Sequence, residues 1–247
     1  MQLIARVYRW VINNELVTVG LLFVIVMGTW GFVSIADEVL EGDSRDIDER
    51  ILLSMRTDGD PADPIGPSWF EEAARDVTAL GSVAALTIFS VAMAGYMYFA
   101  KEPWIALFVV VAVVSGTTVS SVMKSGFNRP RPELVPHETR IYTKSFPSGH
   151  SSMSSLVYLT LGAVMSRAEN RRRAKVFLMA VAVFLLLAIG ISRVYLGVHW
   201  PTDVLAGWAF GVSWAAAAWL VFRFLERRYH LPVESSPNAK VEKCSKP

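Results

Sequence analysis

Six long blocks without a charged residue divide this chain of 247 residues. They cover residues 16–36, 77–100, 103–123, 151–166, 176–192 and 204–222. Each block is close to the length of about 17 to 25 apolar residues that crosses a bilayer as one helix. A helix is expected because hydrocarbon offers no partner to backbone N–H and C=O groups. The sequence therefore predicts an all-α integral membrane protein, a six-helix bundle that forms one domain over residues 1–230.

The first block has two interpretations. Arg6 and Arg9 precede it, and Ser34 and Ala36 form the small-x-small pattern of a signal-peptide cleavage site. The uncharged stretch is, however, longer than the apolar core of a typical signal peptide. Its length favours a membrane anchor that is retained.

The acidic region at residues 37–76 is the longest stretch outside the blocks. Ile47, Ile51 and Met55 recur there at helical spacing, which predicts a short helix at the membrane interface between the first two spans. Residues 58–63 read Asp-Gly-Asp-Pro-Ala-Asp and are expected to form a solvated turn. A calcium loop is the alternative, although the spacing matches no known ligand pattern.

Composition limits the partners of the chain. A formal charge of +2, with basic residues spread over short loops, argues against a nucleic-acid partner and leaves membrane lipids. The single cysteine, Cys244, permits no disulfide within the chain. It lies in the polar tail 231–247, which is expected to be disordered. In the sixth block, Gly207 and Gly211 are spaced to let another helix approach closely.

Chemically active side chains gather on one membrane face. Successive crossings alternate in direction, so the ends of blocks three and five share a face with the starts of blocks four and six. The residues at these positions are Lys124, Arg129, Arg131, His150, Arg193, His199 and Asp203. Independent scatter would rarely produce this distribution, so the sequence predicts one convergent site.

A site with several cations suits an anion with several oxygens, such as phosphate. Arginine offers a planar set of donors and lysine a compact charge. Residues 146–150 add backbone N–H groups just before a helix, where the helix dipole favours an anion. Gly149 lets that backbone approach a ligand closely.

Asp203 follows His199 by four residues, with Pro201 between them in a position that the first turn of a helix tolerates. The carboxylate can reach the imidazole and fix its tautomer, which leaves the other ring nitrogen free to attack phosphorus. His150, from another block, is available to protonate the departing alkoxide.

Each of these residues also has an interpretation without catalysis. Histidines cap helices, basic residues anchor headgroups, and Trp200 fits an aromatic belt. A zinc site at His150, His199 and Asp203 is the rival for the same side chains. Flanking cations oppose a divalent metal, so no metal is expected.

Three motifs occur in order. Lys124-Ser-Gly-Phe-Asn-Arg-Pro-Arg131-Pro132 fits K-x6-R-P, Pro147 to His150 is P-S-G-H, and Ser192-Arg193, His199 and Asp203 fit S-R-x5-H-x3-D. With these motifs the chain resembles the type 2 phosphatidic acid phosphatase superfamily. That superfamily shares its active-site plan with bacterial class A acid phosphatases, glucose-6-phosphatase and vanadium haloperoxidases. The motifs cover about a third of the chain, from 124 to 203, and every spacing agrees.

The resemblance implies a role for each motif position. His199 would be the nucleophile, Asp203 its orienting partner and His150 the general acid. Phosphate oxygens would be bound by Lys124, Arg131 and Arg193, with help from Ser148 and Gly149. No metal or other cofactor is needed. Arg129, Arg140 and Lys144 lie outside the motif positions and receive no role.

The expected function is metal-independent hydrolysis of a lipid phosphate or lipid diphosphate, with the substrate entering laterally from the bilayer. Candidates are phosphatidylglycerol phosphate, phosphatidic acid, undecaprenyl diphosphate and a lipid A phosphate, and the sequence does not choose among them. A lipid phosphotransferase would use the same intermediate. A non-enzymatic lipid transporter is a further alternative, whereas the six spans argue against vanadate-dependent halide oxidation.

Basic residues predict the orientation. Eleven lie on the side of the termini and seven on the other, once Lys124, Arg131 and Arg193 are set aside as site residues. Since cytoplasmic loops are enriched in Lys and Arg, the termini are expected in the cytoplasm. The site would then face the periplasm or exterior of a bacterial inner (cytoplasmic) membrane. The sequence gives no oligomeric state.

Overall fold

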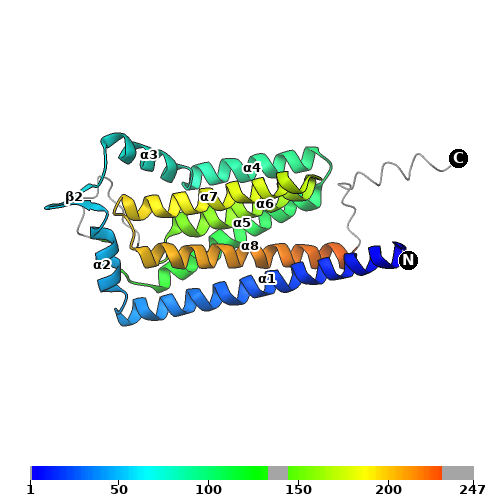
Figure 1. The fold of residues 1–247 in the computed structure, drawn as a ribbon, viewed down its shortest axis with the longest axis horizontal. Coiled ribbons are helices and arrows are strands. Elements are labelled where there is room, and N and C mark those ends of the chain that lie inside the picture. The colour runs from blue at the N-terminus through cyan, green and yellow to red at the C-terminus, as the bar shows by residue number, and fades with distance from the viewer. Residues whose placement is uncertain (1, 133–143, 230–247) are drawn as a thin grey trace.

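The computed structural model describes residues 2–132 and 144–229, with side chains from residue 15 onward in the first stretch. These residues form a bundle of helices with a small cap at one end (Figure 1). The elements are α1 (Gln2–Glu41), α2 (Arg45–Leu53), β1 (Arg56–Thr57), β2 (Asp60–Pro64), α3 (Ser68–Ala79), α4 (Val83–Phe99), α5 (Pro103–Gly126), α6 (Gly149–Ala168), α7 (Arg172–Tyr195) and α8 (Pro201–Tyr229). The tail 231–247 lies outside the described residues.

Within the described ranges, four helices are long and apolar enough to cross a membrane, namely α1, α5, α7 and α8. A fifth crossing results if α3 and α4, bent by 48° at a short break, count as one span. The expected all-α integral membrane fold is confirmed. Length and apolarity alone do not establish six membrane crossings, because α6 is less apolar than the other long helices.

The break between α3 and α4 divides the second expected span, 77–100. Ser82 is the N-cap of α4, and its hydroxyl accepts a hydrogen bond from the N–H of Ala85 at 3.2 Å. A serine at this position satisfies an N–H that has no partner within the helix, so it favours a new helix start. The apolar pattern continues across Ser82 and therefore hid the boundary.

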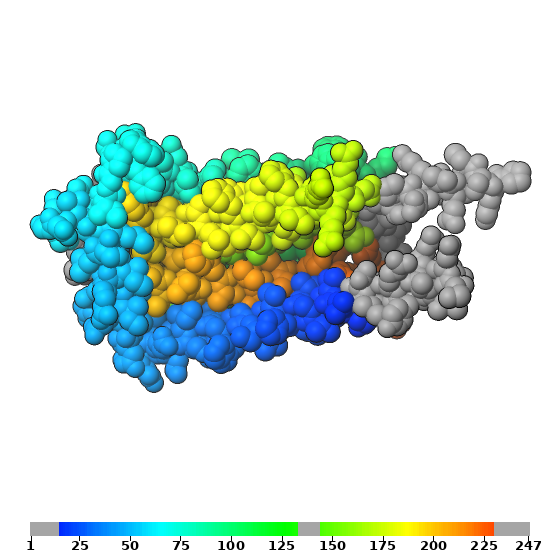
Figure 2. All heavy atoms as spheres, in the orientation of Figure 1, coloured from blue at the N-terminus to red at the C-terminus, as the bar shows by residue number. Residues whose placement is uncertain are grey.

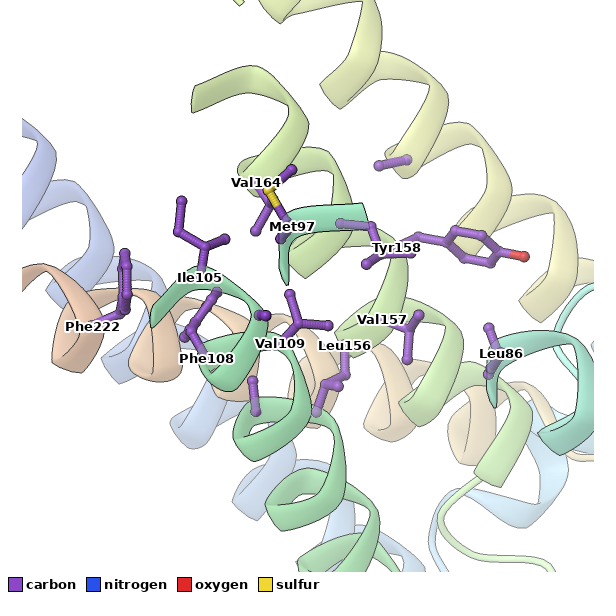
Figure 3. Packing of buried hydrophobic residues seen from close by; sticks show 14 of the residues in the cluster. Leu86, Met97, Ile105, Phe108, Val109, Leu156, Val157, Tyr158, Val164 and Phe222 are labelled. Atoms are coloured by element: carbon purple, nitrogen blue, oxygen red, sulfur yellow. The ribbon is translucent and has the colours of Figure 1, made fainter. Parts of the chain in front are cut away.

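Helix α6 lies at the centre of the bundle, in contact with α4, α5, α7 and α8. Leu156 and Val157 of α6 and Val109 of α5 are completely buried in the main apolar cluster (Figure 3). Phe108 and Phe222 complete it at the far end, with ring centroids 4.7 Å apart. Because lipid tails are as apolar as these side chains, close packing rather than exclusion of water holds such helices together.

Gly207 and Gly211 place α8 directly against α6, as their spacing predicted. A Cβ atom at Gly211 would lie 2.4 Å from the carbonyl oxygen of Ser152, and one at Gly207 would lie 2.9 Å from that of Ser148. The facing surface of α6 consists of buried serines. Their hydroxyls are satisfied within the helix, as in the 2.7 Å hydrogen bond from Ser155 to the carbonyl of Ser151. The polar face of α6 is thus hidden against α8.

The cap consists of α2, a two-stranded hairpin and α3, all at the end of the bundle where α7 leads into α8 (Figure 1). In Figure 2, atoms of α2 and α3 lie over the ends of α7 and α8 on the visible face. The short helix expected near Ile47 and Ile51 is confirmed as α2, which ends at Leu53, before Met55. The cap therefore covers the face on which the site was expected.

The acidic run at 58–63 forms the turn and second strand of an antiparallel hairpin. Gly59 has a φ of 86°, which glycine adopts without strain. The carboxylates bond within the hairpin, since Asp63 accepts from the hydroxyl of Thr57 at 2.8 Å and Asp60 accepts from the N–H of Ala62 at 2.9 Å. The turn is confirmed at Asp58 and Gly59 only, because Asp60 to Asp63, which were expected to belong to it, form part of strand β2.

Candidate active site

The expected catalytic and phosphate-binding side chains come from the ends of four helices at the capped end. Lys124 lies in the last turn of α5, His150 in the first turn of α6 and Arg193 in the last turn of α7. Gly197, with a φ of 69°, turns the chain from α7 toward His199. Electrostatic interactions join His150 with Arg193, His199, Lys124 and Arg131. The structure therefore brings the predicted groups close to one another.

His199 and Asp203 form a buried pair. Nδ1 of His199 lies 3.3 Å from Oδ2 of Asp203, and both side chains are almost completely buried. The same carboxylate oxygen accepts the N–H of Trp200 at 3.0 Å and a short hydrogen bond from the hydroxyl of Ser145. Three donors on one oxygen hold the carboxylate in a single orientation toward the imidazole.

Arg131 determines which nitrogen of His199 carries the proton. Its Nη1 lies 3.1 Å from Nε2 of His199 and also donates to the carbonyl of Val198 at 2.7 Å. A guanidinium can only donate, so Nε2 must be the unprotonated acceptor. Nδ1 then carries the proton and donates to Asp203. The lone pair of Nε2 consequently points toward the cations.

Burial lowers the pKa of His199 from 6.5 to about 4. The positive charges of Arg131 and Arg193 act in the same direction, whereas the hydrogen bond and negative charge of Asp203 raise the pKa. At neutral pH the imidazole is therefore uncharged. An uncharged imidazole with an unprotonated Nε2 is the form that attacks an electrophile.

Arg193 and Lys124 face the start of α6. Arg193 is 9% exposed; its Nη1 donates to the hydroxyl of Thr78 at 3.2 Å, and its Nε has no partner in the described part of the chain. A Cβ atom at Gly149 would lie 3.9 Å from Nζ of Lys124. The ammonium is thus near the first turn of α6, where unpaired N–H groups favour an anion. A buried donor without a partner is one that a ligand can satisfy.

Ser148 joins the starts of α6 and α8. It is completely buried, and its N–H donates to the carbonyl of Asp203 at 3.0 Å. Its hydroxyl accepts from the hydroxyl of Ser151 at 3.1 Å at the N-cap of α6. These contacts give Ser148 a part in holding His150 and His199 at a fixed separation. Direct contact with phosphate stays a prediction for Ser148 and Gly149.

The family comparison covers the segment that carries the three motifs. Residues 103–227, about half of the chain, match the PAP2 superfamily. The chain belongs to this superfamily. The resemblance inferred from the three motifs is confirmed.

Two curated relatives are named as phosphatases of lipid-linked phosphates. Phosphatidylglycerophosphatase B of Bacillus subtilis is 32% identical over 149 residues, which are 58% of this chain and 71% of that protein. Undecaprenyl-diphosphatase of Sulfolobus acidocaldarius is 33% identical over 109 residues, which are 42% of this chain and 47% of that protein. The shared segments are thus partial.

A solved structure shares the fold more completely. The crystal structure of a transmembrane PAP2 type phosphatidylglycerolphosphate phosphatase from Bacillus subtilis aligns with a TM-score of 0.71 and 24% identity. The alignment covers 83% of this chain and 96% of the other. At this identity the likeness establishes the fold.

The PAP2 motif positions leave out Arg129, which the structure places at Asp203. Nη1 of Arg129 donates to Oδ1 of Asp203 at 2.8 Å, and Nη2 donates to Oδ2 of Asp48 at 2.5 Å. The position of Arg129 two residues before Arg131 gave a weak signal, and Asp48 in the acidic region gave none. Lys144 instead donates to the carbonyl of Ser125 at 3.0 Å, and Arg140 lies outside the described residues.

The hydrogen bonds that Asp203 accepts argue against a zinc site. Oδ1 accepts from Arg129 and Oδ2 accepts from Ser145 and Trp200, so both oxygens already face hydrogen-bond donors. Among the described residues no three His, Cys, Asp or Glu side chains form a group that could hold a metal ion. His150 also faces three cations, and His199 faces two of them. These contacts favour an anion over a divalent cation.

Proposed function

We propose that this PAP2 protein hydrolyses the phosphate of a lipid phosphate or lipid diphosphate through a phosphohistidine at His199. The observation that carries the proposal is the state of His199, whose Nδ1 is held by Asp203 while the lone pair of Nε2 points toward Arg131. The printed names of the two relatives, a phosphatidylglycerophosphatase and an undecaprenyl-diphosphatase, support lipid-linked phosphate as the substrate class.

In the first step, Nε2 of His199 attacks phosphorus and the bond from phosphorus to the lipid oxygen breaks. His150 donates a proton to that oxygen, so the lipid leaves as an alcohol or, from a diphosphate, as a monophosphate. Lys124, Arg131 and Arg193 stabilise the non-bridging oxygens, where negative charge is concentrated. The incoming phosphate brings the negative charge that lets His150 hold a proton among these cations.

In the second step, water attacks phosphorus from the side that the alcohol has left. His150, now unprotonated, accepts a proton from this water, and the bond from phosphorus to Nε2 breaks. Inorganic phosphate leaves, and His199 returns to its neutral form with the proton still on Nδ1. Asp203 stabilises the positive charge that the imidazole carries while it is phosphorylated. No step requires a metal.

We place the capped end at the outer membrane–water interface of a bacterial inner membrane, with the termini in the cytoplasm. In this arrangement α3 with α4 is the second span and α6 the fourth, which gives six crossings over the domain 1–230. Helix α6 needs no apolar surface toward lipid, because neighbouring helices enclose it. The lipid substrate would enter laterally between helices, with its tails still in the bilayer.

Purified protein in detergent micelles tests the proposal. Phosphatidylglycerol phosphate, phosphatidic acid, undecaprenyl diphosphate and a lipid A phosphate are offered with excess chelator, and phosphate release is measured. Loss of a catalytic nucleophile costs roughly 10³-fold or more, so His199→Ala should abolish release. Release of phosphate at an undiminished rate by His199→Ala would refute the nucleophile. A second phosphorylated lipid without free phosphate would identify a phosphotransferase, and lipid movement without turnover a transporter.

A further inference from the structure

A buried chain of charged groups runs from the cap to the catalytic pair. Asp48 in α2 is completely buried and accepts from Nη2 of Arg129 at 2.5 Å. Nη1 of Arg129 in turn donates to Oδ1 of Asp203 at 2.8 Å, and Oδ2 of Asp203 holds Nδ1 of His199. One guanidinium thus lies between two carboxylates, one from the cap and one from the site.

Asp48 also binds the first turn of α8. Its Oδ1 accepts the backbone N–H of Thr202 at 2.9 Å, and its Oδ2 accepts the hydroxyl of Thr202 at 2.6 Å. The N–H groups at a helix start have no partner within the helix, and a carboxylate there also interacts favourably with the helix dipole. A side chain of α2 therefore caps α8, the helix that carries Asp203.

Arg129 is held from several sides. Nη1 also donates to the hydroxyl of Thr202 at 2.7 Å, Nη2 lies 3.2 Å from Oγ of Ser44, and the guanidinium carbon lies 5.7 Å from the ring centroid of Trp200. A lysine could supply the charge of Arg129 but not the planar fork that reaches both carboxylates. The geometry thus requires arginine at this position.

We propose that Arg129 and Asp48 are positioning residues for the reaction at His199. Arg129 fixes the position of the Asp203 carboxylate and offsets part of its negative charge. Asp48 in turn fixes the position of Arg129 and offsets part of its positive charge. The inference rests on the proposed phosphatase function. It assigns the cap a part in catalysis, because α2 supplies the residue that holds Arg129.

The charges around His199 define the expected effect on its protonation. The charged or titratable groups that face it are Asp203, Arg131, Arg193 and His150. Lys124 lies beyond His150, and Arg129 and Asp48 lie behind Asp203. Removal of the positive charge of Arg129 leaves two buried carboxylates near the imidazole, which favours protonation of His199. Removal of the negative charge of Asp48 acts in the opposite direction.

The test compares Asp48→Asn, Arg129→Gln, Arg129→Lys and the double variant Asp48→Asn/Arg129→Gln. Asp46→Asn and Arg50→Gln are matched controls, because both side chains are exposed on the same helix α2. Full-length proteins in detergent are assayed with phosphatidic acid and phosphatidylglycerol phosphate over a range of pH. Size-exclusion profiles and thermal midpoints identify variants that do not fold.

Asp48→Asn and Arg129→Lys should lower kcat roughly 10- to 100-fold, as small misplacements of catalytic groups do, while KM changes little. Arg129→Gln should shift the pH at which kcat/KM falls on the acid side upward by roughly one unit. The double variant should return that pH toward the wild-type value with kcat still low. If Arg129→Gln does not fold, Arg129→Lys tests the same claim through kcat alone.

Three results would overturn the inference while the proposed function stands. One is a wild-type kcat in Asp48→Asn and Arg129→Lys, as in the two controls. Another is a folded Arg129→Gln variant whose kcat/KM falls on the acid side at the same pH as that of the wild type. A third is a rise in KM at constant kcat, which would make Arg129 a direct substrate contact. A wild-type protein that releases no phosphate from any lipid phosphate would instead refute the proposed function itself.

Discussion

Gly211→Ala should separate α6, which carries His150, from α8, which carries Asp203. The added Cβ would lie 2.4 Å from the carbonyl oxygen of Ser152 and 2.6 Å from Cβ of Ser155, against an ordinary contact distance of 3.4 Å or more. The backbone of α6 cannot rotate away as a side chain could, so α6 and α8 must part by about 1 Å. Overpacking of this kind costs about 1–3 kcal/mol.

The same displacement should reach the site. Helix α6 begins with Gly149 and His150, and α8 carries Asp203 in its first turn. A misplacement of about 1 Å between reacting groups can lower a rate by up to about 100-fold. Gly211→Ala should therefore lower both the thermal midpoint in detergent, by roughly 2 to 12 °C, and kcat for lipid phosphate hydrolysis.

Gly95→Ala in α4 is the matched control, because a Cβ atom at Gly95 would meet nothing within 4 Å. Alanine has the higher helix propensity, so this variant should keep or slightly raise stability and leave kcat unchanged. The thermal midpoint and phosphate release are measured for both variants in the same detergent. Equal stability and equal kcat for Gly211→Ala and Gly95→Ala would refute the close packing of α6 on α8.

Three further outcomes are expected. Burial lowers the pKa of His199 to about 4, and only the unprotonated imidazole attacks. After correction for ionisation of the substrate, kcat/KM should therefore fall only as the pH drops toward 4. A fall in kcat/KM centred near pH 6.5 would contradict this. Excess chelator should leave the rate unchanged, since the carboxylate oxygens of Asp203 already accept hydrogen bonds; a loss restored by zinc would reverse the assignment. Arg193→Ala should weaken inhibition by orthovanadate roughly 10- to 100-fold, because a charged donor to the anion is lost; unchanged inhibition would remove Arg193 from the phosphate site.

Features with a local signal could be predicted from the sequence. Four of the six spans follow from uncharged length, namely α1, α5, α7 and α8. The pairing of His199 with Asp203 follows from their spacing of one helical turn. The meeting of Lys124, His150 and Arg193 follows from the alternation of crossings across the membrane. The close approach of another helix to Gly207 and Gly211 follows from small residues four apart, and the structure identifies that helix as α6.

The missed features depend on contacts that the local sequence does not reveal. Asp48 is one of many acidic residues between the first two spans, and only the fold brings it to Thr202 and Arg129. The break before α4 depends on the cap at Ser82, within an apolar run that hydropathy alone joins. The burial of the α6 serines against α8 is a further example, because the sequence shows these serines only as part of an uncharged block.

Rapid-quench labelling tests the central claim most directly. Wild-type protein is mixed with a lipid phosphate that carries ³²P in its terminal phosphate, stopped within milliseconds in base, digested and mapped. The account predicts a transient label on the peptide that contains His199, stable in base and lost in acid, as a phosphorus–nitrogen bond is. A label that survives acid on a serine peptide, or release of phosphate with no protein-bound label at any time, would contradict it.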